Sequence, residues 1–143
     1  MEERKIATIR GLHLPISLKT SIEICNFLRY KPTTKAKQIL ERVIEKKQAI
    51  PYKRFVTEMP HRRGKMATGA FPVNASKEIL KLIKSVEANA QHVGLSSDLI
   101  LAEMRASKGP LQWHYGRKRR QKMKRTHIVI SVKEGEQKQP TKK

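Results

Sequence analysis

Two segments with strand-like patterns enclose the most basic stretch of this chain, and this arrangement constrains the fold more than any other feature. Residues 99–107, LILAEMRAS, start apolar and then alternate, and residues 127–132, HIVISV, alternate throughout. About twenty residues separate the two segments, and seven of the nine residues from Arg117 to Arg125 are Lys or Arg. Two strands joined by so short a connection predict a long hairpin. The basic block is therefore expected to form its returning arm.

The alternation also predicts which side chains share a face of each strand. In the first strand, Ile100, Ala102, Met104 and Ala106 fall on one face, and Leu101, Glu103 and Arg105 fall on the other. In the second strand, Ile128, Ile130 and Val132 form the apolar face. We expect these apolar faces to cover the core of the domain.

Three further segments have the three- and four-residue spacing of amphipathic helices. The first segment follows Pro15. The second begins near Thr33 or Thr34 and ends before Pro51, and the third runs from Asn74 to Gly94. Thr20 and Glu23 have the spacing of a capping box, Asn74 is a favourable N-cap, and Gly94 suits a left-handed C-terminal position. Near the N-terminus, Ile6 and Ile9 indicate a short strand that Gly11 interrupts.

Residues 51–73 form a long loop with three Pro, two Gly and no sustained periodicity. Structureless loops longer than about 12–15 residues in compact domains are usually functional or disordered. Here Lys and Arg are interleaved with Tyr52 and Phe55, a mixture that suits phosphate contacts and stacking on unpaired bases. The loop is therefore a candidate binding segment.

The net charge of +20 indicates a polyanionic partner, because such charge opposes compaction through self-repulsion. Nucleic acid is the leading candidate, and an anionic membrane surface is the rival. A single cysteine, Cys25, excludes an intrachain disulfide, and no His pair has metal-ligand spacing. His114 beside Tyr115 lacks a nearby carboxylate to orient the ring. We predict no enzyme activity, no cofactor, no metal site, no secretory signal and no membrane insertion.

The basic stretch itself has three interpretations: a nuclear-targeting run, a solvated arm, or an RNA-binding hairpin. The last explains the flanking strands and the absence of acidic residues from Met104 to Lys133. It also explains the three planar side chains near the apex, Trp113, His114 and Tyr115, which suit base stacking. The predicted RNA-binding residues are Lys53, Arg54, Arg62, Arg63, Lys65, Arg105, Lys108, Trp113, His114, Tyr115, Arg117, Lys118, Arg119, Arg120, Lys122, Lys124 and Arg125.

Several motifs resemble the universal large-subunit ribosomal protein family numbered twenty-two in bacteria and seventeen in eukaryotes. The most specific is Glu87-Ala88-Asn89-Ala90 followed by Gly94-Leu95. Phe71-Pro72-Val73 and residues 50–55, IPYKRF, are similar to the archaeal and eukaryotic branch, as is His127-Ile128. The resemblance extends from about Arg10 to Glu134.

The resemblance implies an α+β fold, with three helices packed on a small antiparallel sheet and one long extended β-hairpin. It implies one domain over residues 1–134, including the loop 51–73 and the hairpin 99–133. The basic tail at 135–143 is expected to be disordered because its own composition is of low complexity. It also implies a structural protein of the large subunit in the cytoplasm, with possible nuclear passage during assembly. The implied partners are ribosomal RNA near the polypeptide exit, neighbouring ribosomal proteins and the nascent chain.

The family's arginine-rich hairpin tip carries over to Gly116-Arg117, and the tip is expected to line the nascent-chain tunnel. The tip candidates are Leu111, Gln112, Trp113, His114, Tyr115, Gly116 and Arg117. This chain departs from the family at Trp113-His114-Tyr115, and its segment between Pro110 and His127 is several residues shorter than is usual.

Overall fold

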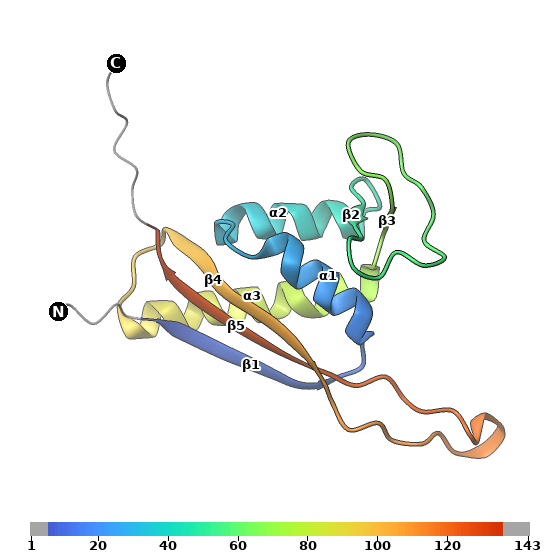
Figure 1. Ribbon diagram of the computed structural model, residues 1–143. Coiled ribbons are helices and arrows are strands. Elements are labelled where there is room, and N and C mark those ends of the chain that lie inside the picture. Colours follow the sequence, from blue (N-terminus) through green and yellow to red (C-terminus); the bar gives the residue numbers. More distant parts are fainter. Residues whose placement is uncertain (1–5, 136–143) are drawn as a thin grey trace.

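A computed structural model of the chain describes residues 6–135 (Figure 1). The predicted basic tail therefore lies, apart from Gly135, outside the described residues. The elements are β1 (Ala7–Leu14), α1 (Leu18–Leu28), α2 (Thr33–Ile44), β2 (Ile50–Pro51), β3 (Gly69–Ala70), α3 (Val73–Val93), β4 (Leu99–Lys108), a 3₁₀ turn (Gly116–Lys118) and β5 (Thr126–Glu134).

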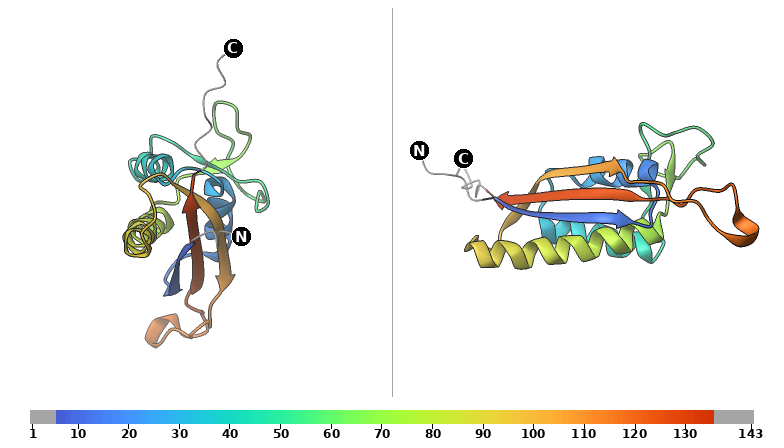
Figure 2. Two further views of the ribbon diagram at one scale, coloured as in Figure 1. Left: turned by 90° about the vertical axis from the view of Figure 1, so that its left-hand side faces the viewer. Right: turned by 90° about the horizontal axis from the view of Figure 1, so that it is seen from below.

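The larger sheet has the strand order β1-β5-β4, and every pairing in it is antiparallel. Helix α3 packs on β1 and β5, α1 packs on β4, and α2 packs against α3. Figure 2 shows the helices gathered against one face of the sheet, while the strands themselves form the opposite face. This arrangement confirms the predicted α+β class, and the long β4–β5 hairpin fits it.

The last strand, β5, is the centre of the sheet, and its apolar face is continuous. Ile128, Ile130 and Val132 are fully buried, as their alternation predicts, and β5 pairs with both other strands. Burial of such aliphatic side chains contributes about 1.5–3 kcal/mol each before conformational entropy is subtracted. The strand that follows the basic block is thus part of the core.

The face prediction for β4 is wrong because the strand contains a bulge. Its register against β5 shifts between Leu101 and Glu103, so the simple alternation breaks there. Leu101 and Met104 are consequently both buried on the helix side, whereas Ile100 is only partly buried. An extra residue in one strand moves every later side chain of that strand to the opposite face of the sheet.

The outer edge of β4 is paired at one end only. Tyr30 donates its backbone N–H to the carbonyl of Leu101 at 2.8 Å, and Leu101 donates to the carbonyl of Lys31 at 3.0 Å. Tyr30 reaches this position with a left-handed backbone, at φ 65°. The link between α1 and α2 therefore covers the edge near Leu101.

Strand β1 extends through Gly11 to Leu14, so Gly11 does not end it, but the register against β5 shifts between Gly11 and Leu14. Gly11 is buried, and a Cβ there would lie 2.8 Å from Cδ1 of Leu82 on α3. The missing side chain lets the strand approach the helix closely, so Gly11 has a packing role.

The helix N-termini also differ from expectation. Ser17 precedes α1, so Thr20 lies inside the helix and forms no capping box with Glu23. Pro72 precedes α3, which places Asn74 inside the first turn. The C-terminal prediction is confirmed, because Gly94 ends α3 in the left-handed region at φ 75°.

Candidate nucleic-acid interface

The β4–β5 hairpin leaves the sheet at a tightly fixed base. Thr126 is fully buried, and its hydroxyl donates to the carbonyl of Ile16 at 2.9 Å. Opposite it, the N–H of Gly109 donates to the carbonyl of Arg125 at 3.0 Å. Residues 109–125, called the distal hairpin below, project beyond the body of the molecule (Figures 1 and 2).

Backbone contacts continue across the distal hairpin to its turn. Met123 donates its N–H to the carbonyl of Gln112 at 2.7 Å, and His114 donates to Gln121 at 2.9 Å. Between these pairs, Trp113 and Lys122 form an antiparallel bridge. The two arms are therefore held together up to residues 115–120, where the chain reverses.

The distal hairpin displays positive charge without acidic neighbours. Arg117 to Arg120, Lys122 and Lys124 are exposed, and Arg125 is partly buried. No ion pair within the described part of the chain involves any of them. Cations this close repel one another unless an anion lies among them, so the arrangement favours binding to closely spaced phosphates.

The planar side chains on the outgoing arm are not core residues. Tyr115 is 88% exposed and Trp113 is 60% exposed, while His114 is partly buried. The ammonium of Lys122 lies 4.6 Å from the centre of the Trp113 ring. One face of the indole is thus occupied by a cation, and Tyr115 is the more accessible surface for stacking.

The tip candidates divide between one arm and the turn. Leu111 to Tyr115 lie on the outgoing arm, and Gly116 and Arg117 belong to the 3₁₀ turn. The turn also contains Lys118 and is followed by Arg119 and by Arg120 at φ 70°. Residues 118–120 therefore share the end of the hairpin with the tip candidates.

The start of the second predicted segment, residues 51–73, is bound by a carboxylate for which the sequence indicated a different role, in a capping box. Glu23 of α1 is only 2% exposed. Its carboxylate accepts the backbone N–H groups of Lys53, Arg54 and Phe55 at 3.1, 2.7 and 2.7 Å. Charge-assisted bonds of this kind are the stronger ones in proteins, so Glu23 fixes the start of the loop.

The loop closes on itself through the short β2–β3 pair and a bridge between His61 and Thr68. Lys53, Arg54, Arg63 and Lys65 are exposed on it. Tyr52, by contrast, is buried, and burial raises the pKa of its hydroxyl. This residue is therefore unavailable for the base stacking that its position in the sequence indicated.

One of the predicted loop cations makes contacts within the loop. Arg62 donates from Nε to the carbonyl of Gly69 at 3.1 Å, and its guanidinium lies 4.9 Å from the Phe71 ring centre. These contacts orient Arg62, while its remaining donors stay available to a ligand.

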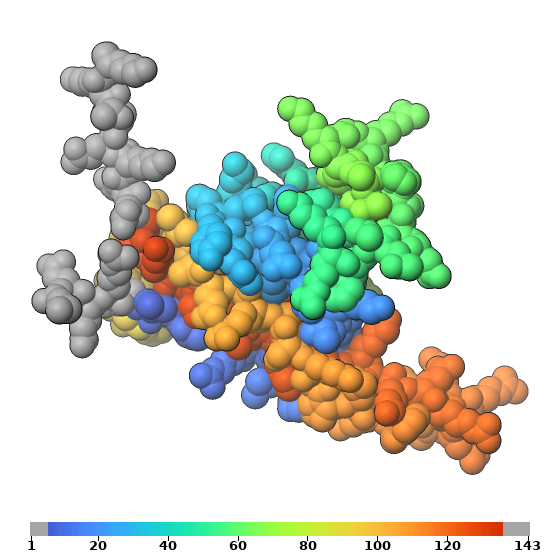
Figure 3. Space-filling view, in the orientation of Figure 1, coloured from blue at the N-terminus to red at the C-terminus, as the bar shows by residue number. Residues whose placement is uncertain are grey.

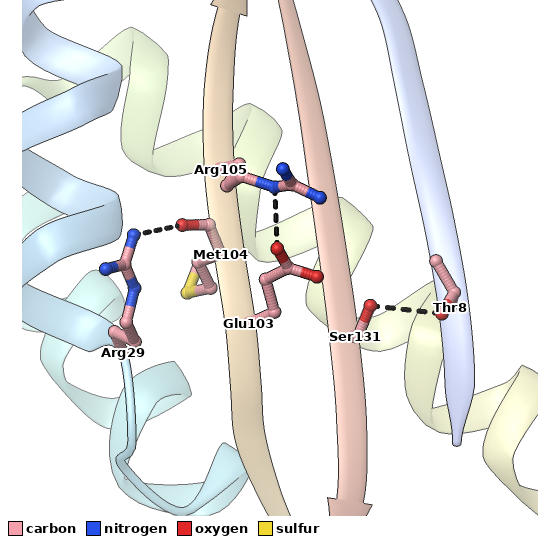
Figure 4. Close-up of polar contacts among 6 residues, drawn as sticks. All are labelled: Thr8, Arg29, Glu103, Met104, Arg105 and Ser131. Atoms are coloured by element: carbon pink, nitrogen blue, oxygen red, sulfur yellow. Dashed lines mark hydrogen bonds and ion pairs between the residues drawn. The ribbon is translucent and has the colours of Figure 1, made fainter.

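Arg105 and Lys108 are exposed on the last part of β4. Nε of Arg105 pairs with Oε1 of Glu103 at 2.6 Å, which leaves its terminal nitrogens unused in that pair (Figure 4). The strand therefore carries two further cations toward the hairpin base.

Figure 3 shows the loop and the distal hairpin at the same end of the molecule, with α1 between them. Figure 2 places this end opposite to the one where β1 begins and β5 ends. Most of the predicted RNA-binding residues are thus gathered at one end, although they come from segments about fifty residues apart in the sequence.

Within residues 6–135, no three His, Cys, Asp or Glu side chains are grouped so that they could hold a metal ion. No helix in the same range is long and apolar enough to cross a membrane.

Comparisons with known proteins agree with this geometry. A family model described as ribosomal protein L22p/L17e matches residues 9–133. Curated relatives carry the name large ribosomal subunit protein uL22. The one from Archaeoglobus fulgidus is 40% identical over 111 residues, covering 76% of this chain and 72% of the relative.

Two longer matches are also archaeal, in agreement with the predicted archaeal and eukaryotic branch. The uL22 protein of Nanoarchaeum equitans is 37% identical, covering 96% of this chain and 84% of its own length. That of Staphylothermus marinus is 35% identical, covering 93% and 92%. The predicted family is confirmed, and this chain belongs to the ribosomal protein L22p/L17e family.

Proposed function

We propose that this chain is a structural constituent of the large ribosomal subunit and stabilises ribosomal RNA by neutralising its phosphates. Family membership and the names of the relatives support this role. The observation that carries the RNA contact is the distal hairpin, an acid-free projection with six exposed cations from Arg117 to Lys124. No catalytic role and no cofactor are part of the proposal.

The position of the protein within the large subunit is inferred from its family. The body of the protein lies near the polypeptide exit, beside neighbouring ribosomal proteins, and the hairpin tip reaches toward the nascent-chain tunnel. The ribosome concerned is cytoplasmic. A nuclear stage of assembly applies only in a cell with a nucleus, where the Arg117–Arg125 run would also serve targeting.

RNA binding is tested by a salt titration with two matched variants. In the tip-charge variant, Arg117, Lys118, Arg119 and Arg120 are changed to Gln. In the helix-charge control, four exposed cations of α2 and α3 are changed to Gln: Lys35, Arg42, Lys77 and Lys84. Both variants lose four charges, so they differ only in where the charge is removed.

Affinity for deproteinised large-subunit RNA is measured between 50 and 200 mM salt. The slope of log affinity against log salt is expected to fall by roughly 3 in the tip-charge variant, at about 0.7–0.9 per phosphate contact. The helix-charge control is expected to keep the wild-type slope. Equal falls in both variants would mean unspecific charge attraction and would contradict the proposed interface.

Placement in the subunit is tested separately in cells. Tagged wild-type protein is expected to sediment with large subunits at physiological salt. A photocrosslinking residue at Tyr115 is expected to label nascent chains on stalled ribosomes, whereas one at Lys84 is not. Sedimentation without nascent-chain labelling would retain the ribosomal role and remove the tunnel contact. Sedimentation free of subunits would overturn both.

A further inference from the structure

Strand β1 contains an extra residue where it runs beside the base of the hairpin. Its register shifts between Gly11 and Leu14, where three steps along β1 lie opposite two steps along β5. Leu12 and His13 are therefore both placed opposite His127, and His13 has a left-handed backbone at φ 54°. Such a bulge interrupts the ladder of backbone hydrogen bonds, so a backbone donor there needs another acceptor.

The side chain of His127 supplies that acceptor. The backbone N–H of His13 donates to Nδ1 of His127 at 3.1 Å, and this bond is called the His13–His127 contact below. The two rings meet edge to face, with their centres 4.7 Å apart and their planes at 83°. An imidazole nitrogen accepts a hydrogen bond only when it carries no proton, so His127 must be neutral, with its proton on Nε2. The bulge is thus held by a bond that only the neutral ring can make.

His127 lies on the face of the sheet that the helices leave open (Figure 2). Ile128 and Ile130 are buried toward the helices, so alternation along β5 places His127 on the opposite face. Register and alternation place further titratable and charged groups on this open face: His13 and Arg10 of β1, Glu103 and Arg105 of β4, and Arg125 just before β5. Glu103 is already paired with Arg105 at 2.6 Å (Figure 4). A proton on His127 therefore adds a positive charge to a face whose unpaired charges are positive.

The His13–His127 contact adjoins the link between the hairpin base and α1. Immediately beyond the bulge, Leu14 pairs with Thr126, and the carbonyl of Leu14 accepts the N–H of Ile16 at 2.8 Å. The hydroxyl of Thr126 donates in turn to the carbonyl of Ile16 at 2.9 Å. The end of β1 thus connects the distal hairpin to the start of α1, and a change in the bulge acts on that connection.

We propose that the His13–His127 contact is a pH-sensitive device, which fixes the hairpin base while His127 is neutral and releases it when His127 takes up a proton. Protonation turns Nδ1 from an acceptor into a donor, so two N–H groups then face each other. The bulge of β1 opens, and the distal hairpin gains freedom to change its angle to the body of the protein. The device is a property of the folded chain and does not rest on the proposed RNA contact.

NMR spectra of the full-length protein test the protonation step. Long-range ¹H–¹⁵N spectra are expected to show His127 with a proton on Nε2 alone at about pH 8 and on both nitrogens at about pH 5, a range that spans the usual titration of imidazole. Protection of the His13 amide, corrected for the intrinsic exchange rate at each pH, should fall about 2- to 10-fold, as for the loss of one hydrogen bond. The amide of Ile130 in the central strand is the internal control and should keep its protection.

Three variants separate the roles of the two histidines. His127→Asn keeps an acceptor oxygen near the place of Nδ1 but does not titrate, so the His13 amide should stay protected at both pH values. His127→Ala removes the acceptor and should give low protection at both. His13→Asn keeps the backbone donor and tolerates the left-handed φ, so it should keep the wild-type pH response. A pH response that persists in H127N, or that disappears in H13N, would overturn the assignment to His127.

Paired spin labels test the release of the hairpin. The labels are attached at Lys84→Cys on α3 and Lys118→Cys in the hairpin turn, both exposed positions. Cys25 is buried, and burial raises the pKa of its thiol to about 12, so it does not compete for the label. The distribution of distances between the labels should broaden from about pH 8 to about pH 5 in the wild-type background.

The same distribution should stay narrow at both pH values when H127N is added and broad at both when H127A is added. A distribution that ignores pH while the His13 amide loses protection would confine the release to the bulge and overturn the effect on the hairpin. An Nδ1 of His127 that is already protonated at about pH 8 would overturn the device as a whole.

Discussion

A single carboxylate, that of Glu23, organises one of the two predicted binding segments. It lies on α1 among buried residues and binds three successive backbone N–H groups of the basic loop. The loop carries cations, but none of their side chains is needed for this contact. The positive side chains of Lys53 and Arg54 therefore stay exposed while their backbone is fixed.

Replacing Glu23 by Ala is expected to lower the free energy of unfolding by about 2–4 kcal/mol, because three backbone donors lose a charged acceptor. Urea denaturation followed by circular dichroism measures the change. Glu23→Gln keeps one carbonyl acceptor and should cost less. Glu41→Gln on the exposed surface of α2 is the control and should change stability by under about 0.5 kcal/mol. An E23A protein as stable as wild type would contradict the anchoring role.

Individual residues were the hardest part of this structure to predict from sequence. Glu23 has the spacing of a capping box with Thr20, but the helix begins earlier and the carboxylate turns to a loop thirty residues away. Gly11 has no side chain by which its packing against Leu82 could be recognised. Arg29 carries no motif, and its role depends on a carbonyl of β4. Long-range contacts decide each case.

At the scale of elements, the apolar periodicity of the sequence predicted helices and strands better than it predicted the contacts of individual residues. Helix α2 begins at Thr33, as predicted, and ends at Ile44, within the predicted limit of Pro51. Gly94 caps the end of α3. β5 alternates throughout and is correctly predicted, whereas the bulge in β4 depends on pairing that its own sequence does not encode. The hairpin could be anticipated because two strand patterns flank one acid-free segment.

The distal hairpin has no core of its own, so cross-strand contacts must order it. The Trp113–Lys122 pair lies between the two outermost described backbone pairs, at Gln112 and His114. A cation–π contact at an exposed site contributes about 0.5–1 kcal/mol. This energy is small for the whole protein but large for a local segment, which can open without global unfolding.

Replacing Trp113 by Ala is expected to speed hydrogen exchange at the amides of His114 and Met123 about 2- to 5-fold, the equivalent of about 0.5–1 kcal/mol. The global unfolding midpoint should not change. Exchange is followed by NMR at single residues. Tyr115→Ala removes an adjacent aromatic ring that is almost fully exposed and serves as the control, with no change expected. Unaltered exchange in W113A would show that the pair does not order the hairpin.

At the scale of the whole molecule, folding brings some positive charges closer together, whereas others are already close to one another in the unfolded chain. Arg117 to Arg120 are neighbours in the sequence, so they repel one another in the unfolded chain as well. Arg29, Arg54 and Arg105 come from three separate segments, and only folding places them around one pocket between α1 and β4. These three arginines, not the tip cations, should therefore account for much of the electrostatic cost of folding at a net charge of +20.

This difference predicts how stability responds to salt. Raising NaCl from 10 to 150 mM shortens the screening length from about 30 to about 8 Å, so the wild-type unfolding midpoint in urea should rise. At 10 mM, R54Q/R105Q should be more stable than wild type by about 0.5–1 kcal/mol, and the gap should close as salt is added. The tip-charge variant loses twice as many charges yet should follow the wild-type salt response. The salt dependence of stability could instead flatten as much in the tip-charge variant as in R54Q/R105Q. That result would show that repulsion in the folded protein depends on total charge alone, and not on which charges folding brings together.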